Sequence, residues 1–253
     1  MEKLVFILFM GLYAAVFSES KNTVAPEIHK KQIEIKKELS KVDSLYQSMN
    51  LKDVVNYKAF AEAMEGYQLL PAKNKDILSI IDFTLASTEK RLVVLDIKNE
   101  KVLFHSLVSH GKNSGSNYAT SFSNTPESYQ SSLGFYVTEN TYQGENGYSL
   151  VLNGLEEGFN DKAKSRAVVV HGADYVNTGI VSALGRLGRS YGCPALPREL
   201  SKPIINTIKD GTLLFIYADN EEYFAKSKVL NHRNALIAHY EKDMADRQFG
   251  TLN

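Results

Sequence analysis

The sequence AVVVHGADY, residues 167–175, precedes the glycine-rich sequence GRLGRSYGCPAL, residues 185–196. The run of three valines predicts a short buried strand, whereas the repeated glycines predict a loop. His171 then stands at the end of the strand, and Cys193 lies in the loop 22 residues later. We expect this arrangement to place both side chains at one rigid edge of a β structure.

The chain on both sides of these stretches carries further short apolar or alternating runs, which predict strands. They are separated by turn residues such as Asn99-Glu100 and Asp210-Gly211. Short strands without alternating helices favour a mainly β fold, an antiparallel sandwich or barrel, over a parallel α/β sheet. The predicted strands cover residues 77–83, 91–97, 101–108, 133–137, 149–152, 167–170 and 213–217.

A long polar stretch rich in Ser, Asn and Gly, Gly111–Ser132, interrupts this pattern. Loops of this length in a compact domain are commonly functional or mobile. We expect it to lie on the surface, to be held by local hydrogen bonds and to flank a cleft. The alternative is an insertion that makes no contact with the site.

Two helices are predicted ahead of the β-rich region. Apolar residues recur in steps of three, four or seven from Pro26 to Met49, which is the spacing of one helix face. A second helix is predicted over Asp53–Glu65, with Gly66 as its stop. We expect this N-terminal helical segment to have a packing role and no chemistry.

The first twenty residues have the pattern of an export signal, with a short basic start, an apolar run and then small residues. The apolar run from Leu4 to Phe17 has about 14 residues, whereas a membrane-spanning helix needs ~20. We therefore expect cleavage near Ser20, no stable membrane span afterwards, and export to the periplasm or cell-wall compartment. The alternative is an uncleaved N-terminal anchor.

The composition is that of a folded protein, because 43% of the 253 residues are apolar and 23% are charged. Lys plus Arg equals Asp plus Glu at 29 each, so no net charge attracts the chain to nucleic acid, and no nucleic-acid partner is expected. His105 and His110 do not share a strand face, and no Cys or carboxylate spacing near them resembles a zinc site. We expect no metal and no other cofactor.

Cys193 is the only cysteine of the chain. Exported proteins usually pair their structural cysteines, so a lone thiol is an inert buried residue, an intermolecular link or a reactive group. A histidine within hydrogen-bond reach is the usual means of converting a thiol to the nucleophilic thiolate. Backbone N–H groups around Gly192 would then stabilise a developing oxyanion. The combination of His171 and Cys193 therefore predicts nucleophilic catalysis.

The sequence Ser190-Tyr191-Gly192-Cys193, downstream of a strand-end His171-Gly172, resembles the signature of the L,D-transpeptidase catalytic domain (YkuD-like). That pattern has a histidine, a gap slightly shorter than the one here, and then Ser or Thr, His, Gly and Cys. The likeness is most specific to the murein L,D-transpeptidase branch and extends over roughly Ile77 to Tyr217. Tyr191 stands where the wider family has a second histidine, and Pro194-Ala195-Leu196 replaces the Arg or Asn often found after the cysteine.

The resemblance implies an all-β catalytic domain whose cysteine attacks a peptidoglycan stem tetrapeptide and releases the terminal D-alanine. An amine of a neighbouring stem then resolves the thioester in a transpeptidase, whereas water resolves it in a carboxypeptidase. The stem peptide is thus the expected partner. Cys193 is expected to be the nucleophile and His171 its base, oriented by the carbonyl of Gly172. The backbone N–H groups of Tyr191, Gly192 and Cys193 are expected to stabilise the oxyanion. The residues expected to bind substrate are Ser190, Arg189 and His110, with Arg198 as a second candidate for the substrate carboxylate.

Other functions remain open at this point. A non-catalytic wall-binding protein on the same fold would have no chemical need for both His171 and Cys193. A sortase-like transpeptidase relies on an arginine a few residues after its cysteine, which Arg198 would satisfy, but the Thr-x-Thr-Cys context of sortases is absent. Asp174 is either a third member of a catalytic triad or a surface or capping residue.

These predictions divide the chain into four parts. They are a signal peptide at residues 1–20, a helical segment at 21–70, an L,D-transpeptidase-like catalytic domain at 71–220, and a charged, helical tail at 221–253.

Overall fold

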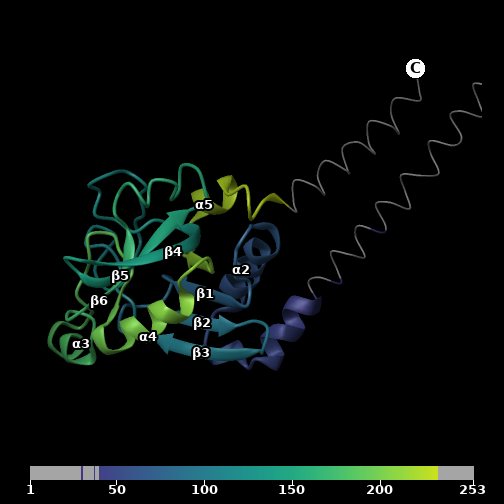
Figure 1. Cartoon of the computed structure of the whole chain (residues 1–253), viewed down its shortest axis with the longest axis horizontal. Coiled ribbons are helices and arrows are strands. Elements are labelled where there is room, and N and C mark those ends of the chain that lie inside the picture. The colour runs from purple at the N-terminus through teal and green to yellow at the C-terminus, as the bar shows by residue number, and fades with distance from the viewer. Residues whose placement is uncertain (1–29, 31–36, 38–39, 233–253) are drawn as a thin grey trace, which may run out of the picture. The chain divides into compact units, whose positions relative to one another are not determined.

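The computed structural model describes residues 30, 37 and 40–232 (Figure 1). One compact unit runs from Leu45 to Leu236, and it holds all the strands of the described residues. The expected signal peptide, half of the first predicted helix and the end of the predicted tail lie outside the described residues. Residues 45–48, at the end of the first predicted helix, are helical.

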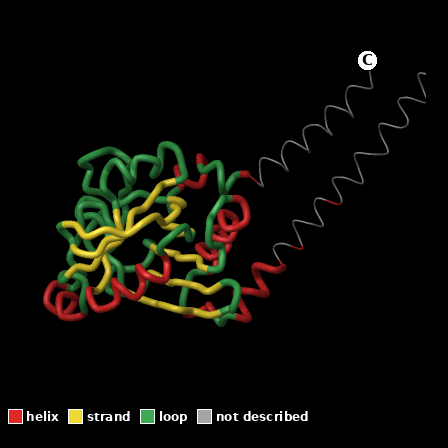
Figure 2. The backbone as a smooth tube through the Cα atoms, viewed as in Figure 1, coloured by secondary structure: helices red, strands yellow, loops and turns green. Residues whose placement is uncertain are grey.

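Eight strands form one mixed sheet in the order β3-β2-β1-β8-β4-β5-β6-β7. The pairs β1–β8 and β6–β7 are parallel, and the other neighbouring strands are antiparallel. Figure 2 shows the strands bundled through the middle of the unit, with the helices at its periphery. The strands are β1 (Ile77–Asp82), β2 (Leu92–Asp96), β3 (Lys101–Ser106), β4 (Gly134–Gly144), β5 (Gly147–Gly154), β6 (Val169–Ala173), β7 (Ala195–Pro197) and β8 (Leu213–Tyr217).

The chain that leaves β3 connects the two edges of this sheet. Ser109 donates its backbone N–H to the carbonyl oxygen of Ala195 in β7 at 2.8 Å, and Gly111 forms a parallel bridge with Ser190. These contacts satisfy backbone groups that an open edge would leave unpaired. The sheet is therefore nearly closed, which confirms the predicted mainly β, barrel-like fold with helices ahead of it.

The centre of the sheet is its most buried part. All residues of β1 and β8 are buried, as expected for strands covered on both faces. Phe135 of β4 stacks on Phe215 of β8 with ring centroids 4.2 Å apart. These long-range contacts between apolar strands form the core, and they account for the agreement between the predicted and observed bounds of β1, β2 and β8.

The helix before the sheet differs from the predicted one. Residues Leu51–Asp53 form a 3-10 turn, and α2 (Tyr57–Leu69) begins where Asn56 accepts a hydrogen bond from the N–H of Lys58 at 2.8 Å. Gly66 does not stop the helix but lies inside it. A Cβ at Gly66 would lie 2.1 Å from the ring of Phe135, so glycine lets α2 approach the sheet closely.

Two further helices were not predicted, and two strand pairs are parallel in a sheet that was expected to be antiparallel. The segment with α3 (Thr178–Leu184) connects β6 to β7, and a parallel pair requires such a crossover. Helix α4 (Arg198–Ile208) follows β7 at once, contacts β6 and buries its three C-terminal isoleucines, Ile204, Ile205 and Ile208. The apolar residues of α4 have helical spacing, but the segment is short and contains Pro203, a residue that usually interrupts helices. For this reason the sequence did not predict the helix.

The start of the predicted tail is helical and packs on the sheet. Helix α5 (Glu221–Lys226) buries Tyr223, whose hydroxyl donates to the carboxylate of Glu156 at 2.7 Å. The same carboxylate accepts hydrogen bonds from the N–H of Phe135 and from the hydroxyl of Ser227. Burial raises the pKa of Glu156, and its three donors oppose this rise. Glu156 therefore ties the segment after β8 to β4.

Candidate active site

The pairing of β6 with β7 brings the loop that carries Cys193 beside β6, the strand of His171. His171 lies opposite Ala195 in this parallel pair, and Cys193 is two residues before Ala195. The N–H of Val169, two residues before His171, lies 3.5 Å from Cys193 Sγ. Among the described residues, no hydrogen bond joins Sγ to the His171 ring. Such bonds are often long in unliganded enzymes and shorten when substrate binds.

The ring of His171 is held by the backbone. Its Nδ1 lies 3.1 Å from the carbonyl oxygen of Gly172, and because a carbonyl can only accept, Nδ1 carries the proton. Nε2 of the neutral ring then has a free lone pair. Burial lowers the pKa of His171, and the positive charge of Arg198 adds to this effect. His171 is therefore neutral near pH 7 and able to accept a proton.

Gly172 has a packing role in addition to its carbonyl. A Cβ at this position would lie 2.5 Å from the Oγ of Ser201 on α4, so a larger residue would push helix α4 away from β6. Glycine at this point lets α4 cover the strand that carries His171.

The thiol of Cys193 is half-buried. Burial raises its pKa, and the N–H of Val169 and the charge of Arg166 partly oppose this rise. The group is thus a thiol at rest, and the imidazole of His171 is neutral. A histidine that accepts the proton is the usual means of forming the nucleophilic thiolate near neutral pH.

Ser190 shapes the turn that presents Cys193. Its hydroxyl donates to the carbonyl oxygen of Cys193 at 2.6 Å and accepts the N–H of Gly192 at 3.1 Å. Gly192 has a φ of 121°, and a Cβ there would lie 2.8 Å from the carbonyl oxygen of Gln130. Because the N–H of Gly192 is occupied by Ser190, the N–H groups of Tyr191 and Cys193 are the better candidates among the three expected oxyanion donors.

The other residues expected to bind substrate have partners within the protein. Arg189 donates to the carbonyl oxygens of Lys112 at 3.0 Å and Gly115 at 2.7 Å. Exposed Arg198 forms a two-point ion pair with Asp174, which gives Asp174 a surface role away from the His171 ring. Both arginines are thus already partly engaged within the protein, Arg189 through Nη1 and Arg198 through Nε and Nη2.

His110 is completely buried, which does not agree with its expected contact with a substrate. Its Nδ1 accepts a hydrogen bond from Arg91 at 2.8 Å, and its Nε2 lies 3.4 Å from the carbonyl oxygen of Gly115. Burial and the charge of Arg91 lower the pKa of His110 to about 4. We infer that this neutral histidine holds the backbone that runs beside Ser190.

A family described as the L,D-transpeptidase catalytic domain matches residues 51–217 of this sequence. The chain belongs to this family. The match spans β1 to β8 and includes His171 and Cys193, and it confirms the resemblance inferred from the sequence motif. The domain is thus of an enzyme family that acts on peptidoglycan.

Solved structures of L,D-transpeptidases are similar at a distance. The enzyme from Mycobacterium smegmatis is 14% identical over 56% of this chain and 59% of its own, with a TM-score of 0.35. That from Stackebrandtia nassauensis is 12% identical over 71% of this chain and 77% of its own, with a TM-score of 0.36. The chain thus spans less than two thirds of the length of the M. smegmatis structure that it matches. No curated protein sequence matches the chain.

Arg166 is a residue of the L,D-transpeptidase domain that sequence reasoning missed. Its guanidinium donates to the carbonyl oxygens of Ser123 and Gln130, each at 2.8 Å, and to two serine hydroxyls. Its charge opposes part of the rise that burial causes in the pKa of Cys193. No spacing singled it out, because its partners are between 34 and 43 residues away along the chain.

The loop Gly111–Ser132 lies beside the catalytic segment of the domain. Ser131 donates its hydroxyl to the carbonyl oxygen of Gly192 at 3.3 Å, and Lys112 donates its N–H to the carbonyl oxygen of Ser190 at 2.7 Å. Several serines of the loop are buried, and Ser131 is among them. The contacts with Ser190 and Gly192 contradict the alternative of an insertion without contact to the site.

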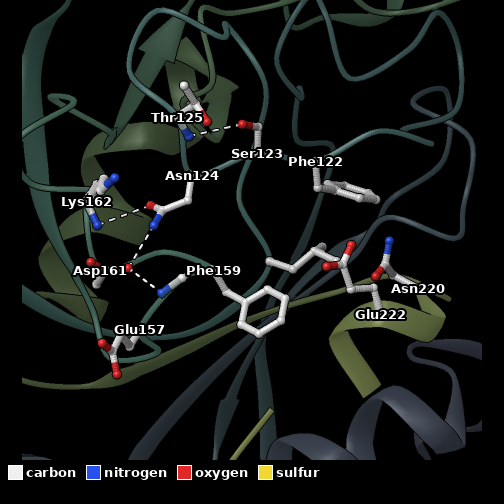
Figure 3. A pocket seen from close by; sticks show the side chains of 12 residues that line it. Phe122, Ser123, Asn124, Thr125, Glu157, Phe159, Asp161, Lys162, Asn220 and Glu222 are labelled. Atoms are coloured by element: carbon white, nitrogen blue, oxygen red, sulfur yellow. Dashed lines mark hydrogen bonds between the residues drawn. The ribbon is translucent and has the colours of Figure 1, made fainter. Parts of the chain in front are cut away.

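A cavity of about 520 Å³ lies away from these residues, between residues 122–125, residues 157–162 and the start of α5 (Figure 3). Asp161 accepts hydrogen bonds from Asn124 and from the N–H of Gly158, each at 2.7 Å. None of its lining residues forms a hydrogen bond with Cys193 or His171 in the described structure. Among all the residues that the structure describes, no group of three or more His, Cys, Asp or Glu side chains is placed to hold a metal. No helix among them is long and apolar enough to cross a membrane.

Proposed function

We propose that this domain is a cysteine-dependent peptidoglycan L,D-transpeptidase that acts on stem tetrapeptides. The observation that supports the proposal is the arrangement of His171 on β6 and Cys193 in the loop before β7. Cys193 is presented beside Val169, and His171, two residues further along β6, has its Nδ1 engaged by Gly172 and its Nε2 free. A nucleophile, a base and an orienting group are the parts that acyl transfer needs.

In the first half of the reaction, His171 Nε2 takes the proton of Cys193 as Sγ attacks the carbonyl that follows the L-centre of the diamino acid. The backbone N–H groups of Tyr191 and Cys193 stabilise the oxyanion, an effect worth roughly 3 kcal/mol per donor in a hydrolase. The C–N bond then breaks, and the leaving D-alanine takes the proton from His171. The product is a thioester on Cys193.

In the second half, an amine of a neighbouring stem attacks the thioester while His171 accepts its proton. The new amide forms, the C–S bond breaks, and the proton returns to Cys193. Water in place of the amine releases a tripeptide, which makes the protein an L,D-carboxypeptidase. This is the second candidate function, because nothing in the site distinguishes the two acceptors.

The test is incubation of the purified protein with stem tetrapeptide and with disaccharide-tetrapeptide, with products identified by mass. Loss of alanine with a cross-linked dimer supports the transpeptidase, whereas loss of alanine alone supports the carboxypeptidase. The absence of both products would support the non-catalytic alternative.

The substrate of this reaction lies outside the cytoplasm, so the proposal includes export to the periplasm or cell-wall compartment. The signal-like pattern of residues 1–20 supports export. N-terminal sequencing of the native protein tests it, because a chain that begins at Met1 would contradict cleavage near Ser20.

The pH profile of kcat/KM should be broader than that of a free imidazole and thiol, whose pKa values are about 6.5 and 8.5. Burial lowers the pKa of His171 and raises that of Cys193. Activity requires a neutral imidazole at His171 together with a protonated thiol at Cys193. We therefore expect activity to fall off on the acidic side below about pH 6.5, where His171 is protonated, and on the alkaline side above about pH 8.5, where Cys193 ionises.

The pH dependence of Cys193 alkylation by iodoacetamide provides a second measurement. Fast alkylation that persists at pH 5 would contradict the neutral pair, because it would indicate a thiolate–imidazolium ion pair at rest.

A further inference from the structure

A cluster of one lysine and two tyrosines joins the loop Gly111–Ser132 to the loop that presents Cys193. Lys112 Nζ is 4.2 Å from the ring centroid of Tyr129 and 4.4 Å from that of Tyr191. The two rings are 4.9 Å apart and inclined at 51°. Tyr191, two residues before Cys193, is 69% exposed, and Tyr129 is 38% exposed. The cluster is therefore open to solvent beside the candidate nucleophile.

The backbone brings these three residues together from separate segments. The N–H of Lys112 bonds to Ser190, which precedes Tyr191, at 2.7 Å. A Cβ at Gly111 would lie 2.5 Å from the carbonyl oxygen of Tyr129, so the two segments are in close contact. The cluster is thus built on backbone contacts and does not depend on the side chains alone.

The backbone of Tyr129 is strained in a way that presents its ring. Its φ is 54°, in the left-handed region that non-glycine residues rarely adopt. Arg166 holds this turn from both sides through the hydroxyl of Ser128 and the carbonyl oxygen of Gln130. Strained residues persist where surrounding contacts enforce them, and they concentrate at functional sites.

The cluster also supplies an ammonium group that forms no hydrogen bond within the described residues, whereas the two expected arginines are partly engaged. Arg189 is bonded to two carbonyl oxygens, one of them that of Lys112, and Arg198 is paired with Asp174. In contrast, Lys112 is exposed and forms no salt bridge within the described residues. Two aromatic faces restrict the otherwise flexible ammonium group while its remaining N–H groups face solvent.

We propose that Lys112, held over Tyr129 and Tyr191, binds the terminal carboxylate of the donor stem peptide, which is that of the leaving residue. This inference rests on the proposed function. The carboxylate belongs to the residue after the scissile bond, so it lies about one residue length, ~3.5 Å, beyond the reacting carbonyl. Tyr191 stands two residues from Cys193, which limits their Cα separation to about 7 Å. A charge-assisted hydrogen bond from the ammonium would fix the donor for attack.

The test compares two donors, stem tetrapeptide with a free C-terminal carboxylate and the same peptide as its C-terminal amide. Wild type should favour the free carboxylate by about 10- to 100-fold in kcat/KM, read from the release of D-alanine or D-alaninamide by mass. Lys112→Gln should lose most of this preference, because its kcat/KM should fall for the free-carboxylate peptide and stay unchanged for the amide. Lys112→Arg should keep the preference.

Lys98→Gln serves as the matched control, because Lys98 is an exposed lysine in the turn between β2 and β3 and pairs with Asp76. It should keep the wild-type preference. The alkylation rate of Cys193 should be the same in every variant, which shows that the site is intact.

Failure of this inference is distinguishable from failure of the proposed function. If wild type releases alanine but treats acid and amide alike, or if Lys112→Gln keeps the preference, the carboxylate site is wrong and the function stands. If Cys193 is alkylated but neither peptide is consumed, both the proposed function and the carboxylate site are wrong.

Discussion

Cys193→Ala should abolish turnover of stem tetrapeptide, and Cys193→Ser should leave it very low. Cys193 is the only cysteine of the chain, so no other thiol can replace it. A serine hydroxyl at this position remains protonated near neutral pH and lacks the nucleophilicity of the thiolate. Mass spectrometry should also find a peptidyl adduct on wild-type Cys193 that neither variant forms.

Both Cys193 variants should fold. Sγ accepts one weak hydrogen bond, from the N–H of Val169 at 3.5 Å, and the loop geometry depends on the backbone of Cys193 and on Ser190. Thermal unfolding should therefore change little. Turnover within about tenfold of wild type in either variant would contradict the assignment of Cys193 as nucleophile.

His171→Ala should lower kcat/KM by on the order of 10²–10⁴, the usual contribution of a general base. The resting thiol has a raised pKa, so without His171 very little thiolate is present near pH 7. The variant should therefore regain activity as the pH rises and the thiol ionises without assistance. Steady-state turnover between pH 5 and 10 measures this effect.

His105→Ala is the matched control for His171. His105 is a partly exposed histidine of β3 whose Nε2 lies 3.1 Å from the carbonyl oxygen of Lys90. Its replacement should leave the turnover and the pH profile as they are in wild type. An unchanged rate in His171→Ala across the whole pH range would show that Cys193 is activated by another group.

The buried strands and the reactive pair were accessible from the sequence because their signals are local. An apolar run such as Leu213–Tyr217 is buried on both faces and coincides with β8. His171 and Cys193 were found through a strand, a glycine-rich loop and a motif that occupy one short stretch of the chain. The carbonyl expected to orient His171 belongs to the next residue, Gly172, and it lies at 3.1 Å in the structure.

Other elements carried no local signal. Strand β7 has three residues, and its partners are β6 and the backbone of Ser109, far away in the sequence. Gly66 has the appearance of a helix stop, yet its role is set by the ring of Phe135 on a strand that begins 68 residues later at Gly134. Tertiary contacts override a local conformational preference wherever burial contributes more to stability than secondary-structure propensity does.

The sequence by itself determined that this protein is a β-rich domain with a histidine–cysteine pair and an L,D-transpeptidase motif. Only the tertiary structure decided that the sheet is mixed and nearly closed, that Arg166 braces the loop beside Cys193, and that Lys112 meets Tyr129 and Tyr191. The physical reason is the range of the interactions. Hydrophobic periodicity and turn chemistry are encoded in neighbouring residues, whereas a cation resting on two rings from distant loops exists only after the backbone has brought those loops together.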